Sequence, residues 1–321
     1  MSKIVVGVLR GGPSSEYDVS LTTGGSVLQH LPEKYIGHDI FISQDGVWHS
    51  YGLARPPEKI LRKVDVVFNA LHGSYGEDGK VQFLLESLHV PYTGSGSFAS
   101  AVGMNKFLSK QVFEREGLKT PQYVFLRAHE VSPAALREIF RSLAHPYVVK
   151  PSSSGSSVGV SIVKSFAEFK IAVTEALKHS SGVLIEEYIR GREGTCGVVE
   201  DFRGEALHSL FPIEIVKPSS NLFFDYDAKY SGKSQELCPA PFSQKEKKII
   251  QEMAVSAHRA LGLRHYSRSD FIVSPRGIYI LETNTLPGLT PRSLIPKSLA
   301  AAGTQFPYFL DHLISLALRG K

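Results

Sequence analysis

Short apolar runs alternate with longer mixed segments along the N-terminal part of the chain. The runs over 4–9, 39–42 and 64–69 have the length and apolar content of buried strands, and the segments between them can hold helices or loops. This alternation predicts a parallel sheet with helical crossovers. Such a sheet binds ligands in the loops at the carboxyl ends of its strands, so we expect a site at the loops over 10–20 and 71–79.

The middle of the chain predicts a second, smaller α/β unit. Helical spacing over 97–117 ends at a glycine, and an apolar strand over 147–150 runs into a loop of serine and glycine. A capped helix over about 166–179 and a strand over 183–189 complete this unit.

The last part predicts two strands, a long loop, a helix, a hairpin and a terminal helical segment. The strands cover 194–201 and 206–215, and a capping box at Ser243 and Glu246 starts the helix. The polar and aromatic loop near 217–236 is unusually long for a compact domain, and such loops are typical of lids.

These patterns predict an α/β protein of three domains, because 321 residues are too many for one ordinary core. A Rossmann-like parallel-sheet domain would cover 1–96, a small central α/β domain 97–187, and a C-terminal α+β domain 188–321. The hydrophobic share of 42% is ordinary for a soluble protein, and no apolar run reaches bilayer length. We therefore expect a cytoplasmic protein.

Charge and cysteine usage narrow the class further. The formal net charge is +5, but basic residues are scattered among acids, and the densest run, 244–248, fits the solvated start of a helix. We expect no nucleic-acid or membrane partner, and anionic phosphates in a cleft would explain part of the excess equally well. Cys196 and Cys238 lack metal-ligand spacing and are expected to be ordinary thiols.

The most informative segment is 279–290, where an apolar strand ends in a carboxylate and an amide. Glu282 and Asn284 are two residues apart, so on a strand they point to the same face. Oxygen ligands of this kind suit a hard cation such as Mg²⁺. Taken alone, an edge hairpin with solvated charges is an equally good interpretation.

The preceding strand, over 265–273, brings further groups to the same place. Arg268 and Asp270 share one face of it, and the turn over 274–277 joins the two strands. A hairpin folded about that turn places Asp270 opposite Glu282 to within about one residue. An arginine in such a position suits a developing oxyanion.

The loop over 150–159 is a candidate phosphate site. Its glycines and serines let backbone N–H groups approach phosphate oxygens, and Lys150 adds a charge at the strand end. It lacks the spacing of the Walker loop, and a flexible serine-rich turn is the plain alternative. Lys106 falls mid-helix in the predicted segment over 97–117, where a solvated surface lysine is the ordinary interpretation.

Acidic residues gather at the end of the strand over 183–189. Glu186 and Glu187 lie within it, and Glu193 follows a short break. A carboxylate at a strand end can accept from ribose hydroxyls, and backbone groups on an apolar hinge can read an adenine edge. An acidic strand terminus in solvent is at least as good an interpretation of the sequence alone.

Six motifs occur in order along nearly the whole chain, and together they are specific although each alone is weak. This order resembles the D-alanine:D-alanine ligases of the ATP-grasp superfamily. The motifs are Gly-Gly-x-Ser-x-Glu-x-x-Val-Ser, Leu-His-Gly-x-x-Gly-Glu-Asp-Gly, Pro-Tyr-Thr-Gly-Ser-Gly, Lys-Pro-x-x-x-Gly-Ser-Ser-Val-Gly, Tyr-Asp-x-Lys-Tyr and Glu-x-Asn-Thr-x-Pro-Gly-Leu-Thr.

The resemblance implies an ATP site between the central and C-terminal units. Its metal ligands would be Asp270, Glu282 and Asn284, which would hold two Mg²⁺ or Mn²⁺ ions, with K⁺ as an optional further ion. The residues implied to bind ATP are Lys106, Lys150, Ser157, Glu186, Glu187, Ile189, Glu193 and Lys229.

The resemblance also implies the reaction. One D-alanine carboxylate would take the γ-phosphoryl group to form an acyl phosphate, and the amine of a second D-alanine would attack its carbonyl carbon. Arg268 and the backbone N–H of Gly288 would hold the tetrahedral oxyanion. The product would serve as a peptidoglycan precursor in cell wall synthesis. The residues implied to bind substrate or act in catalysis are Asp18, His72, Ser156, Tyr230, Arg268, Gly288, Ser293 and Leu294.

One departure from the family bears on the first D-alanine. The family holds the ammonium of that substrate with a glutamate before Val-Ser, and we assign this position to Asp18, which is one methylene shorter. Glu16 is an alternative partner in a different register. We expect activity with altered affinity at this subsite.

Three further expectations concern alternatives and assembly. Tyr230 points to an amine rather than a hydroxy acid as second substrate, although a ligase that uses D-lactate or D-serine remains the nearest alternative. A dinucleotide-binding oxidoreductase is disfavoured because Gly11-Gly12-Pro13 lacks the G-x-G-x-x-G spacing. The resemblance implies a homodimer through the N-terminal domain.

Overall fold

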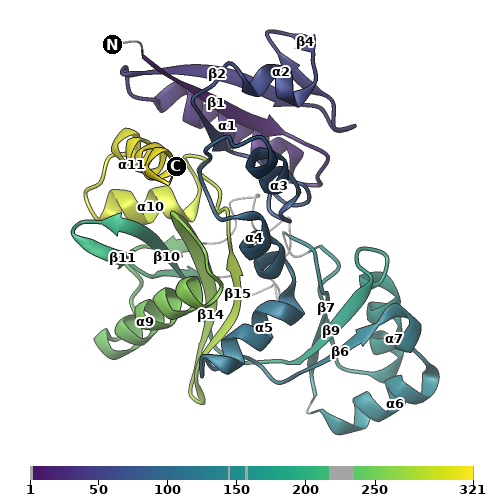
Figure 1. Cartoon of the computed structure of the whole chain (residues 1–321). Coiled ribbons are helices and arrows are strands. Elements are labelled where there is room, and N and C mark those ends of the chain that lie inside the picture. Colours follow the sequence, from purple (N-terminus) through teal and green to yellow (C-terminus); the bar gives the residue numbers. More distant parts are fainter. Residues whose placement is uncertain (1–2, 144, 156–157, 217–234, 321) are drawn as a thin grey trace.

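A computed structural model describes residues 3–143, 145–155, 158–216 and 235–320. Within these ranges the chain forms three β-sheets with helices around them, one sheet from each successive part of the sequence (Figure 1). This mixed α/β architecture confirms the predicted fold class. Every helix in the described ranges is too short or too polar to span a membrane.

The N-terminal sheet is built on β1, which pairs in parallel with β2 and β5 as the sequence predicts. Its order is β4-β3-β2-β1-β5. The strands are β1 (Ile4–Gly11), β2 (Tyr35–Ile42), β3 (Trp48–Ser50), β4 (Leu53–Ala54) and β5 (Val66–Asn69), and the helices of this part are α1 (Tyr17–His30), α2 (Pro57–Leu61) and α3 (Lys80–Ser87).

The central sheet has the order β6-β9-β7-β8, and all of its pairings are antiparallel. Its core gathers Val149 and Ile185 of the sheet against Phe169 of the covering helix α7. The elements are β6 (Tyr123–Arg127), η1 (Ala128–Glu130), α6 (Pro133–Ser142), β7 (Tyr147–Pro151), β8 (Ser161–Val163), α7 (Phe166–Ala176) and β9 (Gly182–Glu187).

The C-terminal sheet has the order β13-β12-β10-β14-β15, with β11 on the free part of β10. The single strand predicted over 206–215 is two strands, because the intervening segment contains Pro212, which has no N–H for a ladder. The elements are β10 (Arg192–Phe202), β11 (Glu205–Ser209), β12 (Ile213–Val216), β13 (Gln235–Leu237), α9 (Gln244–Ala260), β14 (Tyr266–Ser274), β15 (Gly277–Asn284), α10 (Leu294–Ala301) and α11 (Phe306–Arg319). The predicted capping box at Ser243 is present at the start of α9.

The helical segment predicted over 97–117 is broken into α4 (Ser97–Met104) and α5 (Lys106–Arg115). Asn105 causes the break, since its side chain accepts hydrogen bonds from the first backbone N–H groups of α5. Both helices pack on β15, and Ala99 and Phe113 lie in one apolar core with Phe271 of β14. These helices therefore share their apolar core with the C-terminal sheet, and α5 also contacts the central sheet, where Phe107 stacks on Phe125 with ring centroids 4.2 Å apart.

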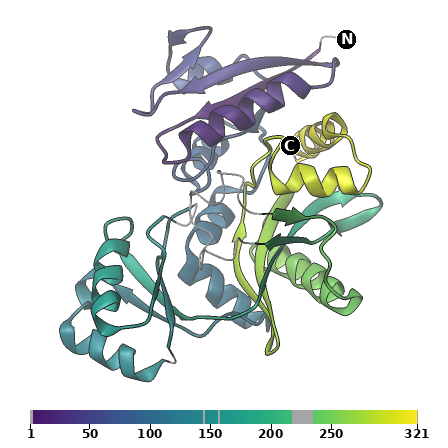
Figure 2. The same ribbon diagram turned by 180° about the vertical axis from the view of Figure 1, so that it is seen from behind.

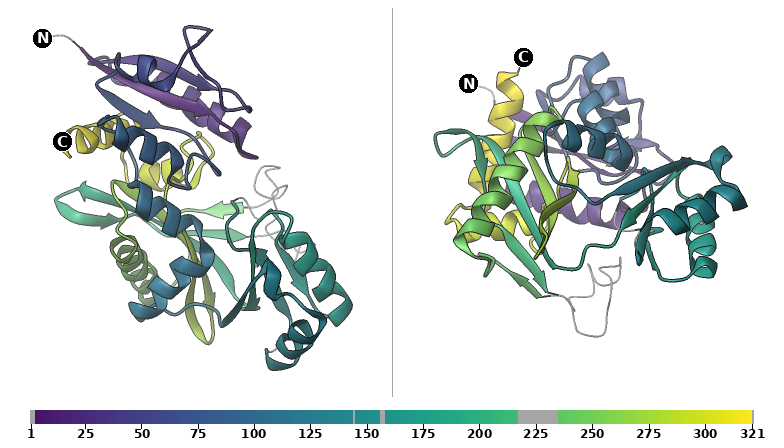
Figure 3. Two further views of the ribbon diagram at one scale, coloured as in Figure 1. Left: turned by 45° about the vertical axis from the view of Figure 1, so that its right-hand side comes forward. Right: turned by 90° about the horizontal axis from the view of Figure 1, so that it is seen from below.

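The last helix ties the two ends of the chain together. Phe309 and Leu313 of α11 share a core with Val6 and Phe68 of the N-terminal sheet. In the view from behind, the yellow C-terminal helices lie just below the purple N-terminal part (Figure 2). The central sheet stands to one side of this combined body (Figure 3). The structure therefore brings loops from all three sheets to one region between them.

Candidate active site

A cavity of about 540 Å³ lies between the three sheets. Its volume is in the range that holds a cofactor-sized ligand. The predicted site residues that line it are His72, Lys106, Lys150, Glu186, Glu187, Ile189, Glu193, Arg268, Asp270, Glu282, Asn284, Gly288, Ser293 and Leu294. Ser156, Ser157, Lys229 and Tyr230 lie outside the described residues.

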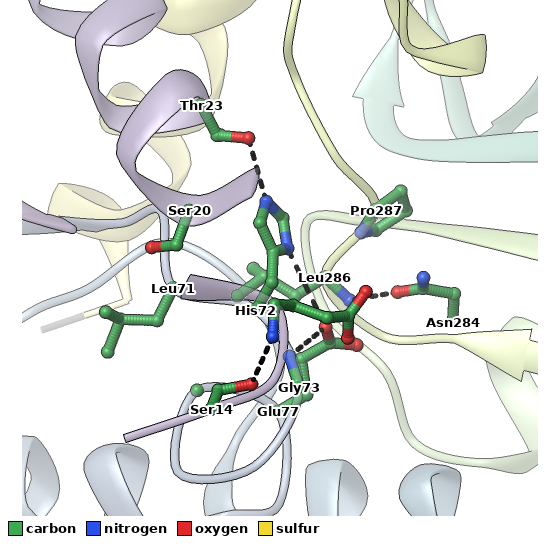
Figure 4. A network of polar contacts seen from close by, with 12 residues as sticks. Ser14, Ser20, Thr23, Leu71, His72, Gly73, Glu77, Asn284, Leu286 and Pro287 are labelled. Carbon is green, nitrogen blue, oxygen red and sulfur yellow. Dashed lines mark hydrogen bonds and ion pairs between the residues drawn. The ribbon is translucent and has the colours of Figure 1, made fainter. Parts of the chain in front are cut away.

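The hairpin of β14 and β15 has the predicted register. Asp270 lies opposite Glu282, and Arg268 lies opposite Asn284. All four side chains line the cavity, because positions two apart on a strand share a face. The amide of Asn284 is fixed by its neighbour, since its Oδ1 accepts a hydrogen bond of 3.0 Å from the backbone N–H of Leu286 (Figure 4).

Both carboxylates of the hairpin contact cations. The guanidinium of Arg268 donates to both oxygens of Asp270, at 3.0 and 3.1 Å, and Thr195 Oγ1 donates to Oδ1 of Asp270 at 2.6 Å. Lys106 Nζ lies 3.0 Å from Oε2 of Glu282. Burial opposes the charge of Arg268, but Asp270 and then Glu282 raise its pKa above the ordinary value, so it is a permanent cation.

The donor set fits a hard metal that arrives with a nucleotide. Among the described residues, no group of three His, Cys, Asp or Glu side chains is placed to hold a metal ion. Asp270 and Glu282 supply two carboxylates and Asn284 an amide oxygen, which leaves positions for phosphate oxygens. Mg²⁺ usually binds through one or two carboxylates together with substrate phosphates, so the arrangement suits a metal–nucleotide complex.

Two lysines reach the cavity from other elements, Lys106 from α5 and Lys150 from β7. Lys106 is the first residue of α5, not a mid-helix residue as the sequence suggested, because the helix restarts at Asn105. Its backbone N–H donates to the carbonyl of Ser152 at 2.8 Å, and its Nζ donates to the carbonyl of Ser154 at 2.7 Å. Lys106 thereby joins the serine-rich loop to the metal hairpin, and Lys150 lies at the end of β7 beside it.

A cluster of buried charges lies deeper, at the end of β9. Glu186 places Oε2 2.7 Å from Nζ of Lys150 and Oε1 2.9 Å from Nζ of Lys110. Burial opposes ionisation of Glu186, but the two ammonium groups hold its pKa below the ordinary value. Burial lowers the pKa of Lys110 to about 8, with Glu186 acting against this shift. Sequence reasoning missed Lys110 because nothing local links residue 110 to residue 186.

The other predicted nucleotide residues lie at the hinge between β9 and β10, which comprises the end of β9, the segment after it and the start of β10. Glu187, Ile189 and Glu193 all line the cavity. Glu187 accepts a hydrogen bond of 2.8 Å from the guanidinium of Arg276, in the turn of the metal hairpin. This contact links the central sheet to the C-terminal sheet at the edge of the cavity.

The loop after β1 bears on the prediction for the first D-alanine subsite. Asp18 is exposed in the first turn of α1 and is not among the cavity-lining residues, whereas Glu16 is buried and lines the cavity. A methyl group on Gly73 or Gly155 would lie 2.9 or 2.7 Å from Oε2 of Glu16, so this carboxylate packs between the two loops that contain them. Two positions along a helix turn the side chain by about 200°, which is why Asp18 faces away.

His72 is held by two neighbours. Its Nε2 lies 2.8 Å from Oγ1 of Thr23, and its Nδ1 lies 3.7 Å from Oε1 of Glu77 (Figure 4). Glu77 Oε1 also accepts from the backbone N–H of Gly73 at 2.8 Å. Glu77 lines the cavity and was missed by sequence reasoning, although the Gly-Glu-Asp-Gly motif contains it.

The segment after β15 closes the cavity on this side. A methyl group on Gly288 would lie 3.0 Å from Oγ of Ser293 and 4.0 Å from Cε1 of His72, so the missing side chain lets these residues meet. Ser293 Oγ accepts from the backbone N–H of Thr290 at 3.1 Å. Gly288, Ser293 and His72 therefore lie close together, and all three line the cavity that Arg268 and the hairpin of β14 and β15 also line.

Comparison with known proteins agrees with this geometry. Residues 112–315 match the family model for the D-ala D-ala ligase C-terminus, and residues 51–95 match that for the N-terminus. A D-alanine–D-alanine ligase of Syntrophobacter fumaroxidans is 43% identical, over 98% of each chain.

Solved structures agree as well. The D-alanine-D-alanine ligase from Coxiella burnetii has a TM-score of 0.85 at 29% identity, covering 100% of this chain and 95% of its own. A D-Ala:D-Ser ligase from Enterococcus faecalis has a TM-score of 0.86 at 32% identity, covering 98% and 100%. The chain belongs to the D-alanine–D-alanine ligase family and has its ATP-grasp fold.

Proposed function

We propose that this protein joins two D-alanine molecules to D-alanyl-D-alanine at the expense of ATP, for peptidoglycan synthesis. The observation that carries the proposal is the placement of Asp270 and Glu282 opposite each other at a cavity that Arg268 and two lysines also line. Carboxylates for a metal, ammonium groups for phosphates and a guanidinium for an oxyanion are the groups that this reaction needs. Family membership selects the substrates.

The nucleotide would occupy the part of the cavity between β9 and the metal hairpin. Lys106 and Lys150 would contact its phosphates, and the hinge with Glu187 and Ile189 would face its adenine. Mg²⁺ or Mn²⁺, held by the hairpin carboxylates, would neutralise phosphate charge during phosphoryl transfer. Lys106 lies 3.0 Å from Glu282, so phosphate oxygens would take over a cation that now pairs with a carboxylate.

The amino-acid substrates would lie nearer the N-terminal loops. We assign the ammonium of the first D-alanine to Glu16, in place of Asp18, because the Glu16 carboxylate lines the cavity beside Gly155. Arg268 has five N–H groups and directs two of them at Asp270, which leaves others for the oxyanion of the tetrahedral intermediate. The backbone N–H of Gly288 would be the second donor.

The family also guides four finer proposals. We propose two metal ions per site with K⁺ as an optional third, a homodimer, a cytoplasmic location, and D-alanine as second substrate. The last is supported by relatives that carry the D-alanine–D-alanine name at about 40% identity over nearly the whole chain. The D-Ala:D-Ser ligase among the similar structures keeps D-serine as the alternative to be tested.

Product analysis tests the proposal. The protein would be incubated with ATP, Mg²⁺ and D-alanine, alone and with equal D-serine or D-lactate, and the products separated by mass spectrometry. We expect D-alanyl-D-alanine, ADP and phosphate in each of these mixtures. A control mixture with L-alanine in place of D-alanine should give no dipeptide. If a mixed product dominates in the presence of D-serine or D-lactate, that compound and not D-alanine is the second substrate. If no ligated product forms, the proposed ligase activity is rejected.

A further inference from the structure

Lys110 is a fully buried lysine that the reaction above does not use. It lies one helical turn after Lys106 on α5, but its side chain has an exposed fraction of 0%. Its Nζ contacts three acceptors: Glu186 Oε1 at 2.9 Å, Thr120 Oγ1 at 2.5 Å and the carbonyl of Pro121 at 3.2 Å. These match the three N–H groups of an ammonium, so Lys110 itself is committed to protein groups.

Glu186 is shared between Lys110 and a lysine that lines the cavity. One carboxylate oxygen faces Lys110 and the other faces Lys150 at 2.7 Å. The cluster therefore contains two positive charges and one negative charge, with side chains exposed by 8% at most. The cluster has a net charge of +1. Lys150 and Glu186 line the cavity, whereas Lys110 does not, so Lys150 is the cation of the cluster that a ligand can reach.

We propose that Lys110 is a positioning residue for the nucleotide. It binds one carboxylate oxygen of Glu186 and balances the charge of that carboxylate, so the positive charge of Lys150 remains available to phosphate. The inference deepens the proposed function and rests on its nucleotide site. Without Lys110, Glu186 and Lys150 would form a closed neutral pair in a region of low dielectric, where the charge of Lys150 would be cancelled locally. Lys110 supplies the counter-charge that prevents this.

A purely structural role for the cluster makes a different prediction. If Lys110 only filled and stabilised the core, its removal would loosen the whole nucleotide site and weaken binding of the base and the phosphates alike. If Lys110 sets the charge of Lys150, its removal would weaken only ligands that carry phosphate. Adenosine and ADP therefore separate the two roles, because they share the base and the ribose.

The test is calorimetric binding of MgADP and of adenosine to wild type, Lys110→Met and the control Lys119→Met. Lys119 is an exposed lysine near the same hinge, donates to the carbonyl of Arg276, and is not among the cavity-lining residues. We expect Lys110→Met to bind MgADP about tenfold more weakly or worse, with adenosine affinity unchanged. Lys119→Met should bind both as wild type does.

A second variant makes the test independent of folding in Lys110→Met. Lys110→Arg retains a positive charge beside Glu186, so Lys150 keeps its own charge while the packing around residue 110 changes. We expect its MgADP affinity to stay within about threefold of wild type.

Three results would overturn the inference. They are unchanged MgADP affinity in Lys110→Met, an equal loss of affinity for adenosine and MgADP in that variant, or a Lys110→Arg variant that binds MgADP at least tenfold more weakly than wild type while its adenosine affinity is unchanged. Binding needs no turnover, so a protein that binds MgADP but makes no dipeptide would reject only the proposed function. A wild type that does not bind MgADP would reject both.

Discussion

The two ends of the cavity hold their charges in different ways. At the closed end, Glu186 lies between Lys110 and Lys150, and the three side chains are exposed by 2%, 0% and 8%. At the open end, Lys106 and Glu282 are exposed by 11% and 35%. The closed end is therefore shielded from solvent, whereas the open end is within its reach.

This difference indicates which charged side chains can exchange partners when a ligand binds. A buried carboxylate loses its hydration and is stable only while its lysines remain in place, so the closed end is preorganised. A partly exposed ion pair contributes little to stability, so its members can separate when a metal and phosphates arrive. Stability and ligand exchange are thus assigned to opposite ends of one site.

The largest expected effect comes from removing the buried carboxylate at the closed end. Glu186→Gln leaves two buried ammonium groups without their counter-charge and should lower the free energy of unfolding by about 3–5 kcal/mol. The matched change at the open end, Glu282→Gln, should cost less than about 1 kcal/mol. Urea unfolding followed by circular dichroism measures both. Equal losses of unfolding free energy in the two variants would contradict the proposed difference between the two ends of the cavity.

Acid should act first on a third region, the junction between the N-terminal and C-terminal sheets. His265 is buried, and its Nδ1 accepts from the backbone N–H of Gly94 at 3.0 Å. Burial lowers the pKa of His265 to about 4, with the carboxylate of Glu200 opposing this shift. A depressed pKa in the folded state means that its contribution is complete above pH 6.5 and is lost as pH falls through 4.

The loss should reach the order of 2–3 kcal/mol across that window. The carboxyl of Glu200 acts in the same direction, since its pKa lies below the ordinary value in the folded protein. Thermal unfolding between pH 7.5 and 4.5 measures the effect. His265→Asn suits the positive φ of 65° at this position and should flatten the profile; an unchanged profile would assign the acid sensitivity elsewhere.

A smaller effect sharpens the assignment at the amino-acid end of the cavity. Glu16→Gln removes the carboxylate assigned to the first D-alanine and should raise the KM for D-alanine about tenfold, the loss expected for a charge-assisted contact. Asp18→Asn, on the exposed side of α1, should leave this KM unchanged. Steady-state kinetics with varied D-alanine distinguish them, and a response confined to Asp18→Asn would restore the original assignment.

The smallest effect concerns the contact across the hinge. Arg276 is largely exposed where it meets Glu187, so Arg276→Ala should leave the free energy of unfolding almost unchanged. The KM for ATP should rise by no more than a few fold. A loss of stability as large as that of Glu186→Gln would show that the hinge, and not the buried cluster, fixes the central sheet.

The sequence predicts the register of the hairpin of β14 and β15 well because its geometry is local. A short turn and the two-residue period of a strand determine that Asp270 meets Glu282. The parallel N-terminal sheet is predictable for a similar reason, since its three apolar runs are well separated. These parts of the site needed no knowledge of distant contacts.

Other parts depend on contacts that no local pattern reveals. Lys110 meets Glu186 only because α5 packs beside the end of β9, so its role is invisible until the fold is known. The choice between Glu16 and Asp18 depends on where α1 begins, and helix boundaries are the least certain element of a sequence-based prediction. The break at Asn105, which turns Lys106 into the cavity, was missed for the same reason.

The proposed metal site is tested most directly by phosphate release from ATP and Mg²⁺ in the presence of D-alanine, with wild type, Glu282→Gln and the control Glu252→Gln. Glu252 is an exposed residue of α9 and is not among the cavity-lining residues. We predict release that depends on D-alanine in wild type and in the control, and a loss of about a hundredfold or more in Glu282→Gln. Release without dependence on D-alanine, or full activity in Glu282→Gln, would contradict the assignment of the hairpin as the metal site of a D-alanine ligase.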